Sequence, residues 1–149
     1  MIVVAKTSVT VLAFDFGTKF IGVAIGSTLT RQARALVSVR VTRAGQPDWD
    51  GLTRLIEEWS PKALIVGLPL NMDGTPNPRT GPARKFGNRL KARYNLPVLM
   101  VDERLTTVLA RQSLREAGVS GTRQKPRLDP EAARHILQAY LDESPEADT

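Results

Sequence analysis

Cysteine is absent from the 149 residues of the chain, and histidine occurs only once. The lack of thiols excludes disulfide bonds, thiol catalysis and zinc–thiolate sites. No apolar run reaches the length that a membrane span needs, and residues 1–6 lack the basic-then-apolar order of a signal peptide. We therefore expect a cytoplasmic protein that has no membrane partner.

Acidic residues are missing from three long stretches, 16–47, 74–101 and 117–128. The formal net charge is +6, although four of the acids are concentrated in residues 142–149. A chain this basic suits a polyanionic partner. A solvated basic surface without a partner is the alternative, but we favour nucleic acid.

Hydrophobic periodicity divides the chain into strands and helices. Alternating or β-branched runs predict strands at 9–15, 20–25 and 35–41, and short apolar runs predict buried strands at 63–67 and 97–101. Apolar residues at helical spacing predict helices at 48–59, 83–94 and 106–117, and a last helix that begins at Asp129-Pro130. Loops are expected at 68–80 and 118–128.

This order of elements predicts an α/β fold. Three strands in an antiparallel meander, followed by two parallel strands, would form a mixed five-stranded sheet flanked by helices. We expect one domain over residues 1–142 and a flexible acidic tail at 143–149. Trp49 and Trp59 share the apolar stripe of the first helix and are assigned to the core. Few aromatic side chains should therefore be exposed, so stacking on single-stranded bases is not expected.

Carboxylates follow the ends of the predicted buried strands. Asp15 ends the first strand, Asp102 and Glu103 end the fifth, and Asp129 opens the last helix. Strands one, four and five should be parallel neighbours, so their carboxyl ends would meet at one edge of the sheet. An all-oxygen site of this kind suits Mg²⁺ or Mn²⁺. Two such ions can activate a water and stabilise the leaving oxygen of a phosphodiester.

Each acid also has a structural alternative. Asp15 could cap the Gly17-Thr18 turn. Only one of Asp102 and Glu103 should face the site, since adjacent strand residues point to opposite faces, and the other would pair with an arginine such as Arg104. Asp129, which precedes a proline, could be an ordinary helix N-cap.

Several motifs stand in a recognisable order and spacing. They are DFGTKFIGVA at 15–24, VGLPLNMDGT at 66–75, VDERLTT at 101–107, DPEAA at 129–133 and ILQAYL at 136–141. The chain resembles the YqgF/RuvX family of Holliday junction resolvases and pre-16S ribosomal RNA processing nucleases. The resemblance implies a ribonuclease H-like fold, with Asp15, Glu103 and Asp129 as catalytic and metal-binding acids. Ser27 stands where many relatives carry an aspartate, which implies that an acid there is dispensable or that the substrate differs.

The remaining candidates surround these acids. We expect Asn71 and Asp73 to shape the site without being essential ligands, and His135 to be solvated rather than catalytic. Supporting positions are Gly17, Thr18, Asn71, Asp73 and Asp102. Nucleic-acid contacts are assigned to Lys19, Arg104, Arg123, Lys125 and Arg127, the last three in a basic loop before Asp129. If that loop is only a connector, the main nucleic-acid contacts would come from the basic helix at 84–91.

The function hypothesis is a Mg²⁺- or Mn²⁺-dependent nuclease that binds two ions and processes the 5′ end of pre-16S ribosomal RNA. A Holliday junction resolvase, acting as a homodimer on branched DNA, is the alternative, and a non-catalytic RNA-binding module is the next. Asp15-x-Gly17-Thr18 also resembles the first phosphate motif of actin-like ATP-binding proteins, but those bind nucleotide between two such domains and this chain has one.

Overall fold

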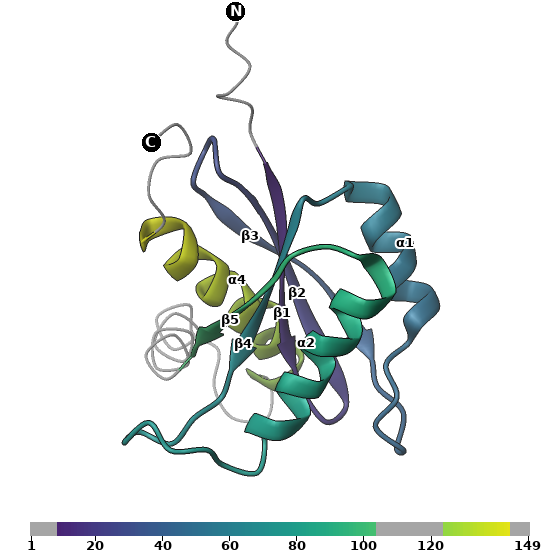
Figure 1. The fold of residues 1–149 in the computed structure, drawn as a ribbon, viewed down its shortest axis with the longest axis vertical. Coiled ribbons are helices and arrows are strands. Elements are labelled where there is room, and N and C mark those ends of the chain that lie inside the picture. Colours follow the sequence, from purple (N-terminus) through teal and green to yellow (C-terminus); the bar gives the residue numbers. More distant parts are fainter. Residues whose placement is uncertain (1–8, 104–123, 144–149) are drawn as a thin grey trace, which may run out of the picture.

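The computed structural model of the chain describes residues 9–103 and 124–143, with side chains in the second segment from Pro130 onward. Its centre is a five-stranded sheet with the strand order β3-β2-β1-β4-β5 (Figure 1). The bounds of the strands are β1 Thr10–Phe16, β2 Phe20–Ser27, β3 Ala33–Arg40, β4 Ala63–Leu68 and β5 Val98–Asp102. The first three strands form an antiparallel meander, and β4 and β5 run parallel to β1. The mixed sheet predicted from the sequence is confirmed.

Two helices cover one face of this sheet. They are α1 at Trp49–Trp59 and α2 at Thr80–Tyr94, close to the predicted bounds. Their apolar residues pack with Leu12, Phe14 and Val66 from the sheet in the larger hydrophobic core. Trp49 and Trp59 are half-buried against that core, as predicted. The predicted helix at 106–117 lies outside the described residues.

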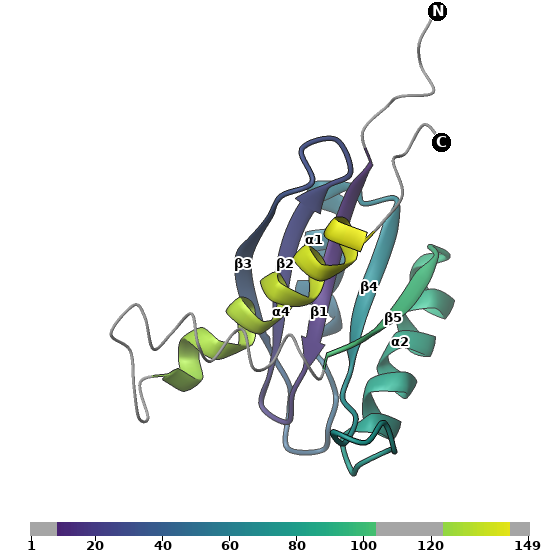
Figure 2. The same cartoon turned by 90° about the vertical axis from the view of Figure 1, so that its left-hand side faces the viewer.

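A single described helix, α4 at Gln124–Glu143, crosses the opposite face of the sheet diagonally (Figure 2). Its stripe of Ala133, Ile136, Leu137 and Leu141 forms a second core with Val11, Ala13, Ala24 and Ile65. Gly26 on the sheet and Ala133 on the helix are small and let α4 approach the sheet closely. A Cβ on Gly26 would lie only 3.0 Å from Leu137 Cδ2 and 3.1 Å from Leu141 Cδ1. No described helix has the length and apolarity to cross a membrane.

The start of α4 differs from the sequence prediction. The helix begins at Gln124 and continues through Pro130, whereas we expected it to begin at Asp129. Apart from Pro126, residues 124–128 are good helix formers, and Pro130 removes only one backbone donor. Lys125 and Arg127 are therefore helical rather than part of a loop, and Arg123 lies outside the described residues.

Candidate functional site

The carboxyl ends of three parallel strands meet at one edge of the sheet, as predicted. Phe14 of β1 pairs with Val66 of β4, and the next residue of β4, Gly67, pairs with Val101 of β5. Asp15 follows Phe14 directly, so it lies level with Gly67. Glu103 follows the last residue of β5, and its backbone N–H donates to the Leu68 carbonyl at 3.2 Å. Two acids that are far apart in sequence thus flank β4.

Asp15 and Glu103 point to the same face of the sheet. Side chains alternate along a strand, so Asp15 shares its face with Ala13 and Glu103 shares its face with Val101. Ala13 and Val101 both pack in the core beneath α4. The two carboxylates are buried, with exposed fractions of 7% and 5%. They therefore lie under α4 and not under the helices of the opposite face.

Gly67 leaves the space in which the Glu103 side chain lies. A Cβ at this position would collide with Glu103 Oε2, and it would lie 3.3 Å from Glu103 Cδ and 2.5 Å from Ile136 Cδ1. The strand, the carboxylate and α4 therefore meet at a point that accepts no side chain. The glycine of the VGLPL motif is required here for close approach rather than for backbone freedom.

The two adjacent acids at the carboxyl end of β5 differ in solvent exposure. Asp102 is exposed, whereas Glu103 is buried. The alternation predicted from the sequence is confirmed, although the metal role of Glu103 stays a prediction. Arg104, the expected partner of Asp102, lies outside the described residues.

Asp129 lies within α4, but its side chain is outside the described part of the structure. It precedes Ile136, the α4 residue next to Gly67, by seven positions, which is close to two helical turns. Its backbone is therefore on the stripe of α4 that meets the sheet. Among the described residues, no group of three acids or histidines is assembled for a metal ion, and the described acids of the site are Asp15 and Glu103.

Arg79 is a site residue that the sequence patterns did not indicate. It is the N-cap residue of α2, and its Nη2 lies 3.8 Å from Asp15 Oδ1 and donates to the Phe16 carbonyl at 3.3 Å. The side chain is half exposed, with 52% of its area accessible. The next residue, Thr80, is buried and its hydroxyl donates to the Pro69 carbonyl. The signal that could have revealed Arg79 was a basic residue directly after the loop that follows a buried strand.

Asn71 and Asp73 build that loop. Asn71 Nδ2 donates to Thr75 Oγ1 at 3.0 Å and to the Pro76 carbonyl at 3.1 Å. Asp73 Oδ1 accepts from the Thr75 hydroxyl at 2.6 Å and from the Thr75 N–H at 3.0 Å. Both side chains are exposed, so the geometry fits the predicted shaping role.

The turn between β1 and β2 is closed by the backbone. Gly17 N donates to the Phe20 carbonyl at 3.0 Å, and a Cβ on Gly17 would lie 2.6 Å from that oxygen. Thr18 and Lys19 are exposed at the tip of this turn. The turn is closed through the backbone of Gly17 and Phe20.

Ser27 lies at the other end of the sheet from these acids. It pairs with Thr10 at the start of β1, whereas Asp15 near the end of β1 pairs with Gly22. The Ser27 hydroxyl accepts from the Leu29 N–H at 3.0 Å. An acid at this position would lie at the opposite end of β1 from Asp15.

His135 is half-buried rather than solvated as expected. The Arg134 guanidinium donates to His135 Nε2 at 3.0 Å. Burial and, to a smaller extent, the positive charge of Arg134 lower the pKa of His135 below its ordinary value. The ring is therefore less exposed than the sequence suggested, because that expectation considered only the apolar stripe of α4 and not the contact with Arg134.

Comparison with known proteins identifies the family. The family model described as "RuvX: Holliday junction resolvase" matches residues 9–143. A protein of Paraburkholderia phymatum named "Putative pre-16S rRNA nuclease" is 52% identical over 140 residues, covering 93% of this chain and 89% of that protein. A protein of the same name from Citrobacter koseri is 49% identical over 134 residues, covering 90% of this chain and 96% of that protein.

Among solved structures, the fold is similar to that of Thermus thermophilus RuvC in complex with a Holliday junction substrate. The TM-score is 0.50 at 14% identity, and the match covers 89% of this chain and 92% of the other. At this identity the likeness concerns the fold alone, and the ribonuclease H-like fold expected from the sequence is confirmed. The chain belongs to the RuvX family of Holliday junction resolvases.

Proposed function

We propose that this protein is a metal-dependent endonuclease that processes the 5′ end of pre-16S ribosomal RNA in the cytoplasm. The observation that carries the proposal is the pair of buried carboxylates, Asp15 and Glu103, that flank Gly67 on the α4 face of the sheet. The names of the relatives support the choice of ribosomal RNA as substrate.

The donor set fits a hard divalent cation. Burying two like charges at one sheet edge is unfavourable unless a cation compensates them. Carboxylate oxygens are the ligands that Mg²⁺ and Mn²⁺ prefer, and the space over Gly67 holds one of the two carboxylates in place. We assign Asp15, Glu103 and Asp129 as the ligands of two ions. When bound, such ions supply Lewis acidity and a metal-activated water for phosphodiester hydrolysis.

The chain's own residues would position the substrate. Helix α4 covers this face of the sheet, and both Ile136 and the Glu103 carboxylate lie against Gly67. Arg79, already within 3.8 Å of Asp15 and half exposed, is placed to pair with a phosphate oxygen that enters the same edge.

The basic residues assigned from the sequence would bind the nucleic-acid backbone. We keep Lys19, which is exposed on the β1–β2 turn, together with Lys125 and Arg127 on α4, and Arg104 and Arg123. Contacts to phosphates position a nucleic acid without reading its sequence. Recognition would then depend on the shape of the substrate.

Side-by-side cleavage tests the proposal. The substrates are a 16S precursor fragment with an extended 5′ leader and a four-way DNA junction, each with and without Mn²⁺. We expect metal-dependent cleavage of the RNA, loss of cleavage in Asp15→Asn, and wild-type cleavage in the control Asp50→Asn, which changes an exposed acid on α1. Retained cleavage by Asp15→Asn would refute the site.

The same experiment separates the alternatives. Cleavage of the DNA junction without cleavage of the RNA would make the protein a resolvase, which we would expect to act as a homodimer because it must cut two strands. Binding of RNA without any cleavage would make it a non-catalytic RNA-binding module.

A further inference from the structure

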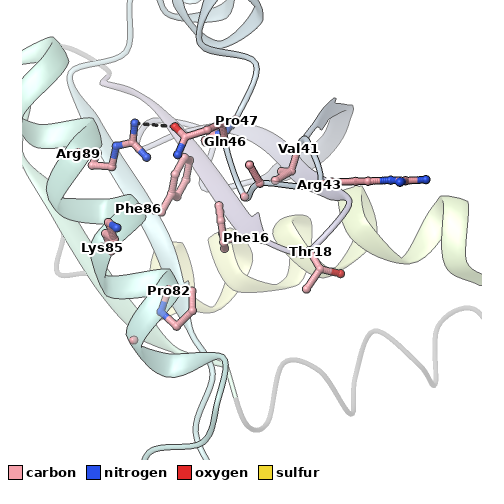
Figure 3. Close-up of a pocket in the computed structure, with 14 residues that line it drawn as sticks. Phe16, Thr18, Val41, Arg43, Gln46, Pro47, Pro82, Lys85, Phe86 and Arg89 are labelled. Atoms are coloured by element: carbon pink, nitrogen blue, oxygen red, sulfur yellow. Dashed lines mark hydrogen bonds between the residues drawn. The ribbon is translucent and has the colours of Figure 1, made fainter.

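A groove of about 570 Å³ lies at the same sheet edge as Asp15, but on the α2 face. Three segments form its walls: the β1–β2 turn, the turn at residues 42–47 that follows β3, and the first turns of α2 (Figure 3). No sequence pattern predicted this groove, and base stacking was not expected from the sequence, because the walls come from segments that are far apart along the chain.

The walls are held in place by hydrogen bonds. Val41 N donates to the Lys19 carbonyl at 2.8 Å and joins the two turns. Arg89 Nη2 donates to Gln46 Oε1 at 3.0 Å and joins α2 to the turn at 42–47, the bond drawn in Figure 3. Gly45, with a φ of 80°, gives that turn a conformation that other residues rarely adopt. The groove is therefore preformed.

The floor is apolar and the rim is cationic. Phe16 and Phe86 line the floor with ring centroids 4.9 Å apart and ring planes tilted by 30°. Phe86 is buried, so the half-buried Phe16 is the aromatic side chain that has accessible surface there, and the exposed Pro82 extends the floor toward solvent. Lys85 is exposed on the rim, and Arg43 is exposed on the turn at 42–47, where its side chain extends away from the groove in Figure 3. Neither has an ion pair among the described residues. The residues that line the groove include no acid.

The groove is adjacent to the candidate active site. Phe16 is the next residue after Asp15 and points to the opposite face of the sheet. Arg79 contacts Asp15 and the Phe16 carbonyl, and it precedes the groove residue Gly81 by two positions. A strand that passes over the end of β1 would reach both the carboxylates and the groove.

We propose that this groove binds unpaired nucleotides of the substrate strand next to the phosphate that is cleaved. This inference rests on the proposed function and adds the requirement for a single-stranded flank. Sites for single strands combine cationic walls, which follow the backbone, with aromatic surfaces for the bases. The volume falls within the range of about 300–1,000 Å³ that is typical of small-ligand sites. A duplex, with its bases paired inside, would leave the apolar floor unused and would contact the rim no more than it contacts the other exposed basic residues of α2.

Binding without divalent metal separates this proposal from cleavage. The probes are a fluorescein-labelled 10-nucleotide RNA without self-complementarity and the duplex that it forms with its complement, each followed by fluorescence anisotropy in EDTA with the full chain. Lys85→Gln is compared with Lys91→Gln, an exposed lysine of α2 outside the groove. Arg43→Gln is compared with Arg84→Gln, an exposed arginine that also lies outside the groove.

We expect each groove substitution to weaken single-strand binding about threefold more than its control, with a salt slope lower by about 0.7 for each phosphate that the variant no longer neutralises. Duplex binding should change equally in a groove variant and its control. Equal losses of single-strand binding in variant and control would overturn the proposal, as would a duplex loss as large as the single-strand loss. If these binding differences appear while the wild type cleaves neither substrate, the groove is supported and the nuclease proposal fails.

Discussion

Substituting alanine for Gly67 tests how tightly the candidate site is built. The new Cβ would collide with Glu103 Oε2 and would lie 2.5 Å from Ile136 Cδ1. Relief requires that the Glu103 carboxylate and the Ile136 side chain shift, or that α4 move away. Overpacking of this kind typically costs about 1–3 kcal/mol of unfolding free energy. In a protein of this size, each kcal/mol lowers Tm by about 2–4 °C, so we expect a Tm about 2–12 °C below that of the wild type.

The displacement of Glu103 should also weaken metal binding. Changing a residue that positions a metal ligand commonly reduces affinity about 10- to 100-fold, and we expect a loss of that size for Mn²⁺, measured by calorimetric titration. Cleavage should fall with it.

Gly26→Ala is the matched control. Gly26 also lies beneath α4, where a Cβ would be 3.0 Å from Leu137 Cδ2, but it is in the part of β2 that pairs with the start of β1. We expect it to lose stability while it retains Mn²⁺ affinity. A Gly67→Ala variant that melts, binds Mn²⁺ and cleaves like the wild type would refute the placement of Glu103.

Three further changes have expected outcomes. Glu103→Gln should abolish cleavage and Asp102→Asn should retain most of it, because Glu103 is buried and Asp102 is exposed; a larger loss in the Asp102 variant would reverse the assignment. Arg79→Gln should tighten Mn²⁺ binding about two- to fivefold in calorimetry, because it removes a cation 3.8 Å from Asp15. The same variant should bind RNA more weakly than the wild type. Weaker Mn²⁺ binding would contradict this expectation. The pKa of His135 is lowered in the fold, so the unfolded chain binds the proton more readily and stability should fall as pH drops from 7.5 through the ordinary value of about 6.5. Thermal melts at pH 7.5 and 5.5 should show a smaller fall for His135→Gln, and an equal fall would argue against that role.

Local patterns predicted the parts of the fold that depend on local physics. Alternation along β5 predicted that only one of Asp102 and Glu103 faces the site, because neighbouring strand residues face opposite sides, and the family resemblance pointed to Glu103. The same alternation, with the crossover rules, placed Asp15 beside β4 and β5.

The parts that were missed depend on interactions between distant segments or on competing local preferences. Arg79 reaches Phe16 across 63 positions of sequence, and no local pattern encodes that interaction. Phe16 directly follows the strand predicted at 9–15 and drew no assignment, but its place at the end of β1 puts it in the floor of a groove. The start of α4 was misplaced because Pro130 was taken as a first helical residue, while the helix formers before it extend the helix.

The central claim is that Asp15, Glu103 and Asp129 together bind divalent metal, and anomalous diffraction from a crystal soaked in Mn²⁺ tests it most directly. We predict anomalous peaks at the edge where β1, β4 and β5 end, with carboxylate oxygens of all three residues as ligands. The matched crystal of Asp15→Asn should lose at least one of these peaks. An ion held mainly by Asp73, or peaks that are unchanged in Asp15→Asn, would contradict the claim.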